Sequence, residues 1–333
     1  MKIMIAGLGS IGRRHLRNLL ALGERDILLY RTQHSTLPDD ELAGFPVETN
    51  LERALAHQPE AVIISNPTAL HLEVAIPAAR GGGQGSARCL MLEKPVAESM
   101  VCIPELQAAV SESGARVLVG FHFRYHPGLQ RLKQLLAAGE AGRPLSVRAQ
   151  WGEYLPGWHP WEDYRQGYSA RSDLGGGVVL TLSHPLDYLR WLFGEVAALW
   201  AFTGKISDLE LQVEDTAEIG LRFASGVLGS LHLDYNQRPP SHWLEVVGSQ
   251  GTLRWDNLSG EVRVFQSETG EWQVYPPPAG FERNDLFLEE MRHFLQVARG
   301  EAEPLCSLAD GIHALQLALA VHDSQQQGKL IYL

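Results

Sequence analysis

The sequence is poor in cysteine and in positive charge. Its three cysteines, Cys89, Cys102 and Cys306, lie far apart and lack CxxC spacing, so neither a disulfide framework nor a zinc site is expected. Lysine and arginine number 28 against 39 acidic residues, a net charge of -11, and no clustered basic face is visible. We therefore expect a reducing compartment, no metal centre and no nucleic-acid partner.

The sequence also has no long apolar run. No stretch reaches the ~18 consecutive apolar residues that a membrane span needs, and Met1-Lys2 leads into an apolar strand pattern instead of a signal peptide. At 333 residues the chain is longer than one hydrophobic core usually organises. We expect a cytoplasmic protein of two domains with no membrane partner.

The N-terminal third alternates between short apolar runs and amphipathic segments. Strands apolar on both faces that alternate with helices indicate a parallel sheet covered on each side. We predict a doubly wound α/β Rossmann domain over residues 1–120 and a surface loop at the glycine-rich insert 81–86. The predicted strands are 2–6, 26–30, 61–65, 88–92 and 117–120, and the predicted helices are 11–22, 51–57 and 70–80.

The pattern changes after Pro127, where alternating apolar and polar residues dominate. This alternation predicts an α+β domain over residues 121–333 with an open, mainly antiparallel sheet. We expect its C-terminal helices to pack back toward the N-terminal domain. The predicted strands are 146–154, 197–204, 216–223, 226–235, 243–248, 252–255 and 330–332, and the predicted helices are 128–138, 186–193, 285–299 and 307–325.

The stretch Gly7-Leu8-Gly9-Ser10-Ile11-Gly12 has GxGxxG spacing and stands between a predicted strand and a predicted helix. In such a turn the first glycine permits the tight bend, the second admits a pyrophosphate and the third lets helix and strand pack closely. The helix N-terminus adds N–H donors and a positive dipole. We predict dinucleotide contacts along this turn; the alternative is an ordinary strand-to-helix turn. The predicted cofactor-binding residues are Gly7, Gly9, Ser10, Ile11 and Gly12.

The second strand ends in Leu29-Tyr30-Arg31-Thr32, without the acid that bonds a ribose 2′-hydroxyl in NAD sites. Arg31 can pair with a 2′-phosphate and lie over the adenine, and Thr32 can donate a hydrogen bond. The sequence therefore favours NADP. NAD is the alternative, with Arg31 as a solvent-exposed residue after a strand.

Glu93-Lys94-Pro95 follows the strand 88–92, so it emerges at the edge where open α/β sheets bind ligands. A surface ion pair there would add little stability, which favours a functional role. The whole chain resembles the Gfo/Idh/MocA family of nicotinamide-dependent oxidoreductases, which joins a Rossmann domain to an α/β domain with an open antiparallel sheet. Four segments carry the resemblance: AGLGSIGRRH, Ser65 to His71, Glu93-Lys94-Pro95, and Gly175 to His184 with Asp187.

The resemblance implies that Lys94 bonds the reacting hydroxyl of the substrate and helps to move its proton. It also implies cofactor contacts from Asn66, Pro67, His71, Glu93 and Lys94.

His184 is the second residue that the resemblance singles out as catalytic. It precedes Pro185 and a predicted helix, where the dipole disfavours an imidazolium and leaves a neutral ring able to take a proton. The alternative is a capping or core histidine. Most relatives carry an aspartate four residues earlier, but here Leu180 stands at that spacing, with Thr181 next to it. Asp187 either orients the substrate or favours the helix start.

The segment from Trp158 to Arg171 is too polar and aromatic for a core strand. Aromatic faces with interleaved Arg, Asp and hydroxyl groups suit a sugar; the alternative is an aromatic lid without ligand contacts. Arg124, Tyr125 and His126 resemble family positions that face the same cleft. The predicted substrate-binding residues are Lys94, Arg124, Tyr125, Trp158, Arg165, Tyr168, Thr181, His184 and Asp187.

Together these features predict an NADP- or NAD-dependent oxidoreductase that moves a hydride between nicotinamide and a secondary alcohol or ketone of a sugar-like substrate, including nucleotide-activated or nonulosonic sugars. One alternative is a cofactor-retaining enzyme that oxidises a sugar transiently before elimination or hydrolysis. Another is a nonenzymatic dinucleotide-sensing protein. We also expect a homo-oligomer, a dimer or tetramer, formed through the open sheet of the second domain.

Overall fold

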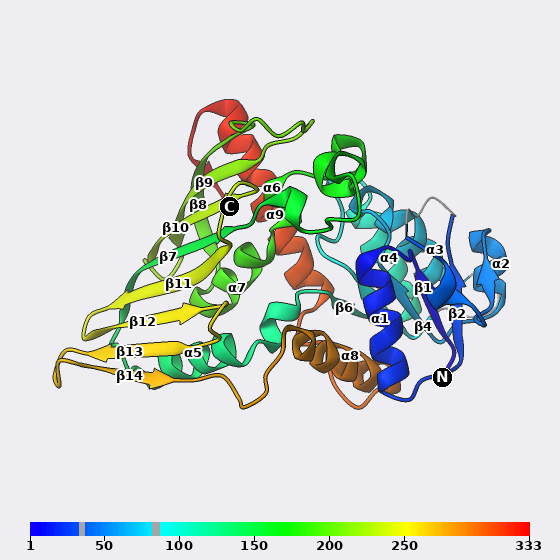
Figure 1. Cartoon of the computed structure of the whole chain (residues 1–333), viewed down its shortest axis with the longest axis horizontal. Helices are drawn as coiled ribbons and strands as arrows, with labels where there is room; N and C mark the ends of the chain where they lie inside the picture. The colour runs from blue at the N-terminus through cyan, green and yellow to red at the C-terminus, as the bar shows by residue number, and fades with distance from the viewer. Residues whose placement is uncertain (33–36, 82–86) are drawn as a thin grey trace. The chain divides into compact units, whose positions relative to one another are not determined.

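Figure 1 shows a computed structural model of the chain, which describes residues 1–32, 37–81 and 87–333. Residues 82–86 of the predicted glycine-rich loop lie outside this description. The chain forms two compact units. The first contains residues 1–122, 173–175 and 283–315, and the second contains 123–172, 176–282 and 316–333. The C-terminal part of the chain therefore contributes to both units.

The first unit is built on a six-stranded sheet in the order β3-β2-β1-β4-β5-β6, with every neighbouring pair parallel. β1, β4 and β5 in the middle of the sheet are fully buried, as the continuous apolar runs predict. The chain order reverses between β1 and β4, which creates a crevice at the carboxyl ends of these strands. The strands are β1 (Ile3–Ala6), β2 (Ile27–Tyr30), β3 (Val47–Glu48), β4 (Ala61–Ile64), β5 (Cys89–Leu92) and β6 (Arg116–Val119).

Helices cover this sheet, among them one from far along the chain. α1 (Ser10–Ala21) and α8 (Arg283–Arg299) lie side by side, and α8 also contacts β5 and β6 (Figure 1). α3 (His71–Arg80) packs on α4 (Ile103–Ser113). The remaining helices of this unit are α2 (Leu51–Ala56) and the 3₁₀ turns η1 (Asp40–Leu42) and η2 (Thr68–Leu70).

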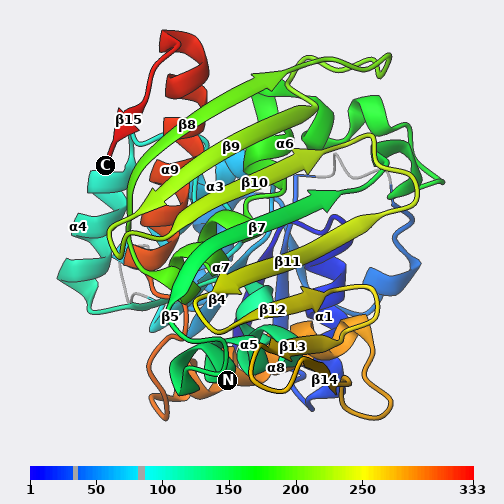
Figure 2. The same cartoon turned by 90° about the vertical axis from the view of Figure 1, so that its left-hand side faces the viewer.

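The second unit is built on a nine-stranded sheet in the order β14-β13-β12-β11-β7-β10-β9-β8-β15 (Figure 2). Every neighbouring pair is antiparallel except β7 and β10. The strands are β7 (Pro144–Gly152), β8 (Val196–Gly204), β9 (Thr216–Phe223), β10 (Leu228–Asp234), β11 (Ser241–Gly248), β12 (Gly251–Asp256), β13 (Val262–Gln266), β14 (Glu271–Tyr275) and β15 (Ile331–Tyr332).

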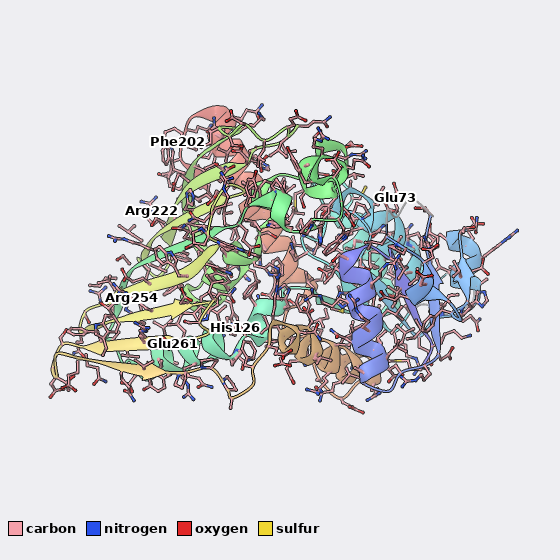
Figure 3. The ribbon with its side chains drawn as sticks, in the orientation of Figure 1. Glu73, His126, Phe202, Arg222, Arg254 and Glu261 are labelled. Carbon is pink, nitrogen blue, oxygen red and sulfur yellow. The ribbon has the colours of Figure 1, made fainter. Side chains whose placement is uncertain are left out.

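One face of this sheet packs on helices. α5 (Pro127–Ala138), α6 (Val178–Thr181) and α7 (His184–Phe193) lie behind the strands in Figure 2, whereas Phe202, Arg222 and Arg254 lie on the outer face (Figure 3). Burial alternates along β9 and β11 accordingly. The helix α9 (Leu308–Gln327) begins in the first unit and ends in the second. Further 3₁₀ turns are η3 (His122–Tyr125), η4 (Leu155–Gly157), η5 (Tyr164–Gln166), η6 (Tyr168–Ala170) and η7 (Ser172–Leu174).

The predicted fold class, a Rossmann sheet followed by an open and mainly antiparallel one, is confirmed. The predictions omitted the strands β3, β13 and β14 and the helices α4 and α6. β3 is only two residues long, and β14 is exposed on both faces, so neither has the apolar pattern of a packed strand. Within the described part of the chain, no helix has the length and apolarity to cross a membrane.

Candidate functional site

The turn between β1 and α1 has the shape that a dinucleotide pyrophosphate requires. Gly7 has φ +93°, and a Cβ there would lie 2.4 Å from the backbone nitrogen of Asn66. A Cβ at Gly12 would lie 2.0 Å from the carbonyl oxygen of Gly7. A Cβ at Gly9 would meet no atom within 4 Å, so open space lies in front of this residue. Gly7 and Gly12 thus serve close packing, and open space lies in front of Gly9; the pyrophosphate contact at Gly9 stays a prediction.

The helix α1 begins at Ser10 without a side-chain cap. Its first N–H groups therefore remain available to an anion. Ile11 follows at half-buried depth, and Ser10 is exposed. The residues present fit the phosphates of a dinucleotide.

The loop after β4 lies against this turn. The hydroxyl of Ser65 donates to the carbonyl oxygen of Gly7 at 2.9 Å. Asn66 donates from Nδ2 to the carbonyl of Leu70 at 2.9 Å, whereas its buried Oδ1 has no hydrogen-bond partner among the described residues. Pro67 then leads into η2. An orphaned acceptor beside the glycine turn is a second feature that fits a bound cofactor.

A carboxylate that was not predicted lies next to Arg31 at the end of β2. Nη1 of Arg31 lies 2.7 Å from Oδ1 of Asp39, and Arg13 lies 3.6 Å from the same carboxylate. Asp39 is therefore an acid that sequence reasoning missed, because it stands several residues beyond the end of β2 in the sequence. Nε of Arg31 is buried without a partner among the described residues, and Thr32 is exposed. The positive charge predicted to select a 2′-phosphate thus has a carboxylate beside it.

Glu93 and Lys94 stand at the carboxyl end of β5. Oε1 of Glu93 accepts from Nε2 of His15 at 2.7 Å, and Oε2 accepts from the backbone N–H of Lys94 at 3.2 Å. Burial acts to raise the pKa of Glu93, but the hydrogen bond and charge of His15 and the charge of Lys94 outweigh it and lower the pKa. Glu93 was predicted to contact the cofactor, but both of its carboxylate oxygens accept hydrogen bonds from the protein. Lys94 is half-buried.

His71 joins two of the loops that carry predicted site residues. Its Nδ1 lies 2.9 Å from the carbonyl oxygen of Pro95 and its Nε2 lies 2.9 Å from that of Asn66. The ring is 1% exposed, and burial lowers its pKa. His71 therefore holds the loops after β4 and β5 together, a structural function in addition to the cofactor contact predicted for it.

In the second unit, Arg124 and Asp187 form a bidentate ion pair. Nε and Nη2 of the arginine lie 2.9 and 2.7 Å from the two carboxylate oxygens, and both side chains are buried. This geometry is the strongest form of an arginine–carboxylate contact. Both residues were predicted to contact substrate, and the structure pairs them with each other.

His184 is the first residue of α7, whereas the predicted helix begins at Leu186. Its ring lies 5.0 Å from the centroid of Phe123, edge to face, and 5.6 Å from that of Trp151. Thr181, also buried, ends the short helix α6. The aromatic neighbours were missed because Phe123 and Trp151 are distant in sequence and carry no motif. Tyr125 is buried as well.

His126 has a capping function. Its Nδ1 accepts the backbone N–H of Gly128 at 2.9 Å at the start of α5, and burial lowers its pKa to about 4. Nε2 of the neutral ring is buried without a partner among the described residues.

In the segment from Trp158 to Arg171, Trp158 and His159 each have a buried ring nitrogen without a partner among the described residues, and Arg165 is paired. Nε1 of Trp158 is buried without a partner among the described residues, and its ring stands edge-on to Tyr235 at 5.5 Å. Arg165 is exposed and bonds Asp163 and Glu210. Tyr168, half-buried, starts η6. Trp158 thus keeps a donor for a ligand, while Arg165 already has two carboxylates.

Two family models match the chain. Residues 1–121 match the oxidoreductase family with an NAD-binding Rossmann fold, and residues 129–254 match the GFO/IDH/MocA C-terminal domain. The first match covers the six-stranded sheet, and the second covers β7 to β11 and part of β12 in the nine-stranded sheet.

The similarity to several known proteins covers the whole length of the chain. Myo-inositol 2-dehydrogenase of Thermotoga maritima is 27% identical over 353 residues, covering 100% of this chain and 98% of the relative. An NAD(+)-dependent scyllo-inositol 2-dehydrogenase of Bacillus subtilis is 25% identical over 349 residues, covering 100% and 96%. A solved levoglucosan dehydrogenase, in complex with NADH and levoglucosan, has a TM-score of 0.84 at 20% identity and covers 100% of this chain and 99% of that one.

Proposed function

The chain belongs to the Gfo/Idh/MocA family of oxidoreductases, and we propose that it oxidises a secondary alcohol of a sugar-like substrate, or reduces the corresponding ketone, with a nicotinamide dinucleotide. The observation that carries this proposal is the built dinucleotide turn, with open space at Gly9 and an uncapped α1 behind it. The names of the inositol and levoglucosan dehydrogenases support a polyol or sugar as substrate.

The nicotinamide ring supplies the hydride acceptor or donor when it is bound. Lys94, half-buried at the carboxyl end of β5, donates a hydrogen bond to the reacting hydroxyl and stabilises the developing alkoxide. His184 accepts the hydroxyl proton in oxidation and returns it in reduction. The rings of Phe123 and Trp151 lie beside the His184 imidazole and limit the access of water to it.

The choice of dinucleotide is the finer part of the proposal. Arg31 supports NADP(H) through pairing with a 2′-phosphate, but the carboxylate of Asp39, 2.7 Å from its Nη1, repels that same phosphate. We propose NAD(H) as the working cofactor, with NADP(H) as the alternative in which Arg31 turns from Asp39 to the phosphate.

The substrate end of the proposal rests on the second unit. The unpartnered Nε1 of Trp158 offers one hydrogen bond and its ring one stacking surface for a sugar. Arg124 and Asp187 form an ion pair with each other. We therefore propose that this pair orients α7, and with it His184, instead of binding the substrate. A nucleotide-activated or nonulosonic sugar stays a prediction, since Arg165 is already bonded to carboxylates.

We also propose that copies of the chain meet through the outer face of the nine-stranded sheet. Phe202 and Arg222 lie on this face (Figure 3), Leu228 stands opposite Arg222 in the β10–β9 register, and the Arg222 guanidinium lies 5.7 Å from the centre of the Tyr332 ring. Phe202, Leu228 and Tyr332 are 61%, 58% and 73% exposed. Exposed aromatic and apolar side chains of this extent are typical of interaction surfaces. Light scattering at micromolar concentration would find a dimer or tetramer; a monomer contradicts the proposal. The cytoplasmic location stays a prediction.

The proposed reaction is tested by incubating the protein with inositols and sugars in the presence of NAD⁺ or NADP⁺ and following nicotinamide absorbance. Lys94→Ala lowers kcat about 10²- to 10⁴-fold while NADH binding persists. An unchanged kcat in Lys94→Ala contradicts the assignment. Tightly retained cofactor without net turnover points to the cofactor-retaining alternative. Unchanged cellular function after alanine substitution of both Lys94 and His184 points to the sensing alternative.

A further inference from the structure

The first unit buries three ionisable side chains next to the loop that carries Lys94. His15 comes from α1, Glu93 from the end of β5 and Glu290 from α8, and their exposed fractions are 0%, 7% and 0%. His15 bonds Glu93, and Glu290 lies close enough to Glu93 for the two carboxyl groups to interact electrostatically. Buried ionisable groups are costly unless they are paired, so this His15–Glu93–Glu290 cluster requires a reason.

Glu93 connects the cluster to the backbone of Lys94. Nε2 of His15 donates to one carboxylate oxygen at 2.7 Å, and the N–H of Lys94 donates to the other at 3.2 Å. A Cβ at Gly120 would lie 3.0 Å from that second oxygen, so the glycine leaves the carboxylate just enough room. The carboxylate of Glu93 therefore ties Lys94 to the helix that starts at the dinucleotide turn.

The two buried acids differ in charge. Burial and the negative charge of Glu93 raise the pKa of Glu290 well above its ordinary value, and neither of its oxygens has a hydrogen-bond partner among the described residues. The pKa of Glu93 is lowered instead, because His15 and Lys94 outweigh its burial. The surroundings therefore favour the carboxylate form of Glu93 and the protonated form of Glu290.

Other ionisable groups surround the cluster. Burial lowers the pKa of His71 on α3 and of His122 on η3, so both rings are neutral. Arg14 on α1 interacts with the charge of Glu93, and Arg283 on α8 lies near Arg14 and His122. His15 differs from these groups in that its side chain donates a hydrogen bond to a carboxylate oxygen of Glu93, at 2.7 Å.

We propose that His15 is a positioning residue for Lys94, acting through the carboxylate of Glu93. This inference rests on the proposed function, in which Lys94 contacts the reacting hydroxyl. Two hydrogen bonds, one to each oxygen of Glu93, then link the helix that binds the cofactor phosphates to the residue that binds the substrate. Such a link matters because misplacing a reacting group by 1 Å costs on the order of 100-fold in rate.

The test compares His15→Gln with His15→Asn. A glutamine amide can place an N–H donor where Nε2 of histidine lies, whereas the shorter asparagine amide ends near the position of Nδ1 and leaves Glu93 without its donor. We expect His15→Asn to lower kcat about 10- to 100-fold, with a far smaller change in the KM for NADH, and His15→Gln to recover most of the loss. If His15→Asn does not fold, His15→Met takes its place, because it fills the site without a donor.

His57→Asn is the matched control. His57 and Glu48 form a similar pair at 3.0 Å in the same unit, but this pair is partly exposed and contributes little. Its kcat and pH profile stay those of the unsubstituted protein.

The pH dependence separates positioning from a merely structural role. In His15→Asn, Glu93 loses the partner that lowers its pKa, so the acid limb of the kcat profile moves up by about 1 to 3 pH units. The same titration is followed without turnover by NMR of glutamate carboxyl groups labelled with carbon-13, the Glu93 signal being assigned from Glu93→Gln.

An upward shift of the Glu93 titration together with a lower kcat supports the proposal. A kcat and pH profile unchanged in His15→Asn, or equally changed in His57→Asn, overturns it. Absence of NADH binding to the unsubstituted protein refutes the proposed function instead; the NMR titration then still decides the inference, which fails if the Glu93 signal does not move.

Discussion

Replacing Glu290 by glutamine should make the protein more stable at neutral pH. Glu290 is fully buried, and its carboxyl oxygens have no hydrogen-bond partner among the described residues. Burial, and then the charge of Glu93, raise its pKa well above the ordinary value. Glutamine has the same shape as the protonated acid and remains neutral at every pH, so it removes the titration without opening a cavity.

The magnitude follows from proton linkage. Between the unfolded-state pKa of about 4.3 and the raised pKa of the folded state, the folded protein binds a proton that the unfolded chain has released. The contribution of Glu290 to stability is therefore complete below this window and falls as pH rises through it. The slope for one proton is about 1.4 kcal/mol per pH unit.

The assay is urea unfolding of the unsubstituted protein and Glu290→Gln at a series of pH values from about 4 to 8. Subtracting the two free energies of unfolding cancels the other titrating groups. We expect similar stability near pH 4 and an advantage for Glu290→Gln that grows with pH. Parallel curves across the whole range would refute the reasoning, because Glu290 would then be titrating alike in both states.

Three further predictions concern the sites described above. Asp39→Asn removes the carboxylate beside the β2 arginine and shifts the NADPH-to-NADH affinity ratio toward NADPH by about tenfold in calorimetric titration; an unchanged ratio denies Asp39 this role. Gly12→Ala lowers the free energy of unfolding by about 1–3 kcal/mol, measured by thermal unfolding. Gly9→Val keeps the stability of the unsubstituted protein and weakens NADH binding at least about tenfold. A Gly12→Ala variant of unchanged stability, or a Gly9→Val variant that binds NADH as tightly as before, contradicts the turn geometry. Asp187→Leu leaves Arg124 buried without its bidentate partner and costs about 3–5 kcal/mol in urea unfolding, and a smaller loss than in the exposed-pair variant Glu245→Leu contradicts this prediction.

Much of the first unit could be predicted from the sequence because its signals are local. The GxGxxG spacing between an apolar run and an amphipathic segment fixes β1, the turn and α1 within a few residues. β14 could not be found the same way, because four of its five residues are exposed and no core pattern marks it. The helix α4 was missed although Ile103, Leu106 and Ala109 recur at helical spacing on its buried side.

The residues of the candidate site also differ in whether a local sequence signal marks them. Lys94 and His184 stand in recognisable motifs, whereas Asp39 reaches Arg31 only through the fold. Glu290 did carry a signal. It falls on the buried stripe of α8 with Phe287, Met291 and Phe294, while Glu289 beside it is exposed. A carboxyl on an apolar stripe is the kind of local conflict that marks a functional or strained position.

The most direct test of the account is a calorimetric titration of the purified protein with NADH and NADPH in parallel, repeated with Arg31→Ala. We expect saturable binding of one dinucleotide per chain, tighter for NADH, with Arg31→Ala removing what affinity there is for NADPH. Tighter binding of NADPH would indicate that Arg31 pairs with the 2′-phosphate, and it would contradict the proposal that Asp39 repels this phosphate. Binding of neither dinucleotide would contradict the oxidoreductase account itself.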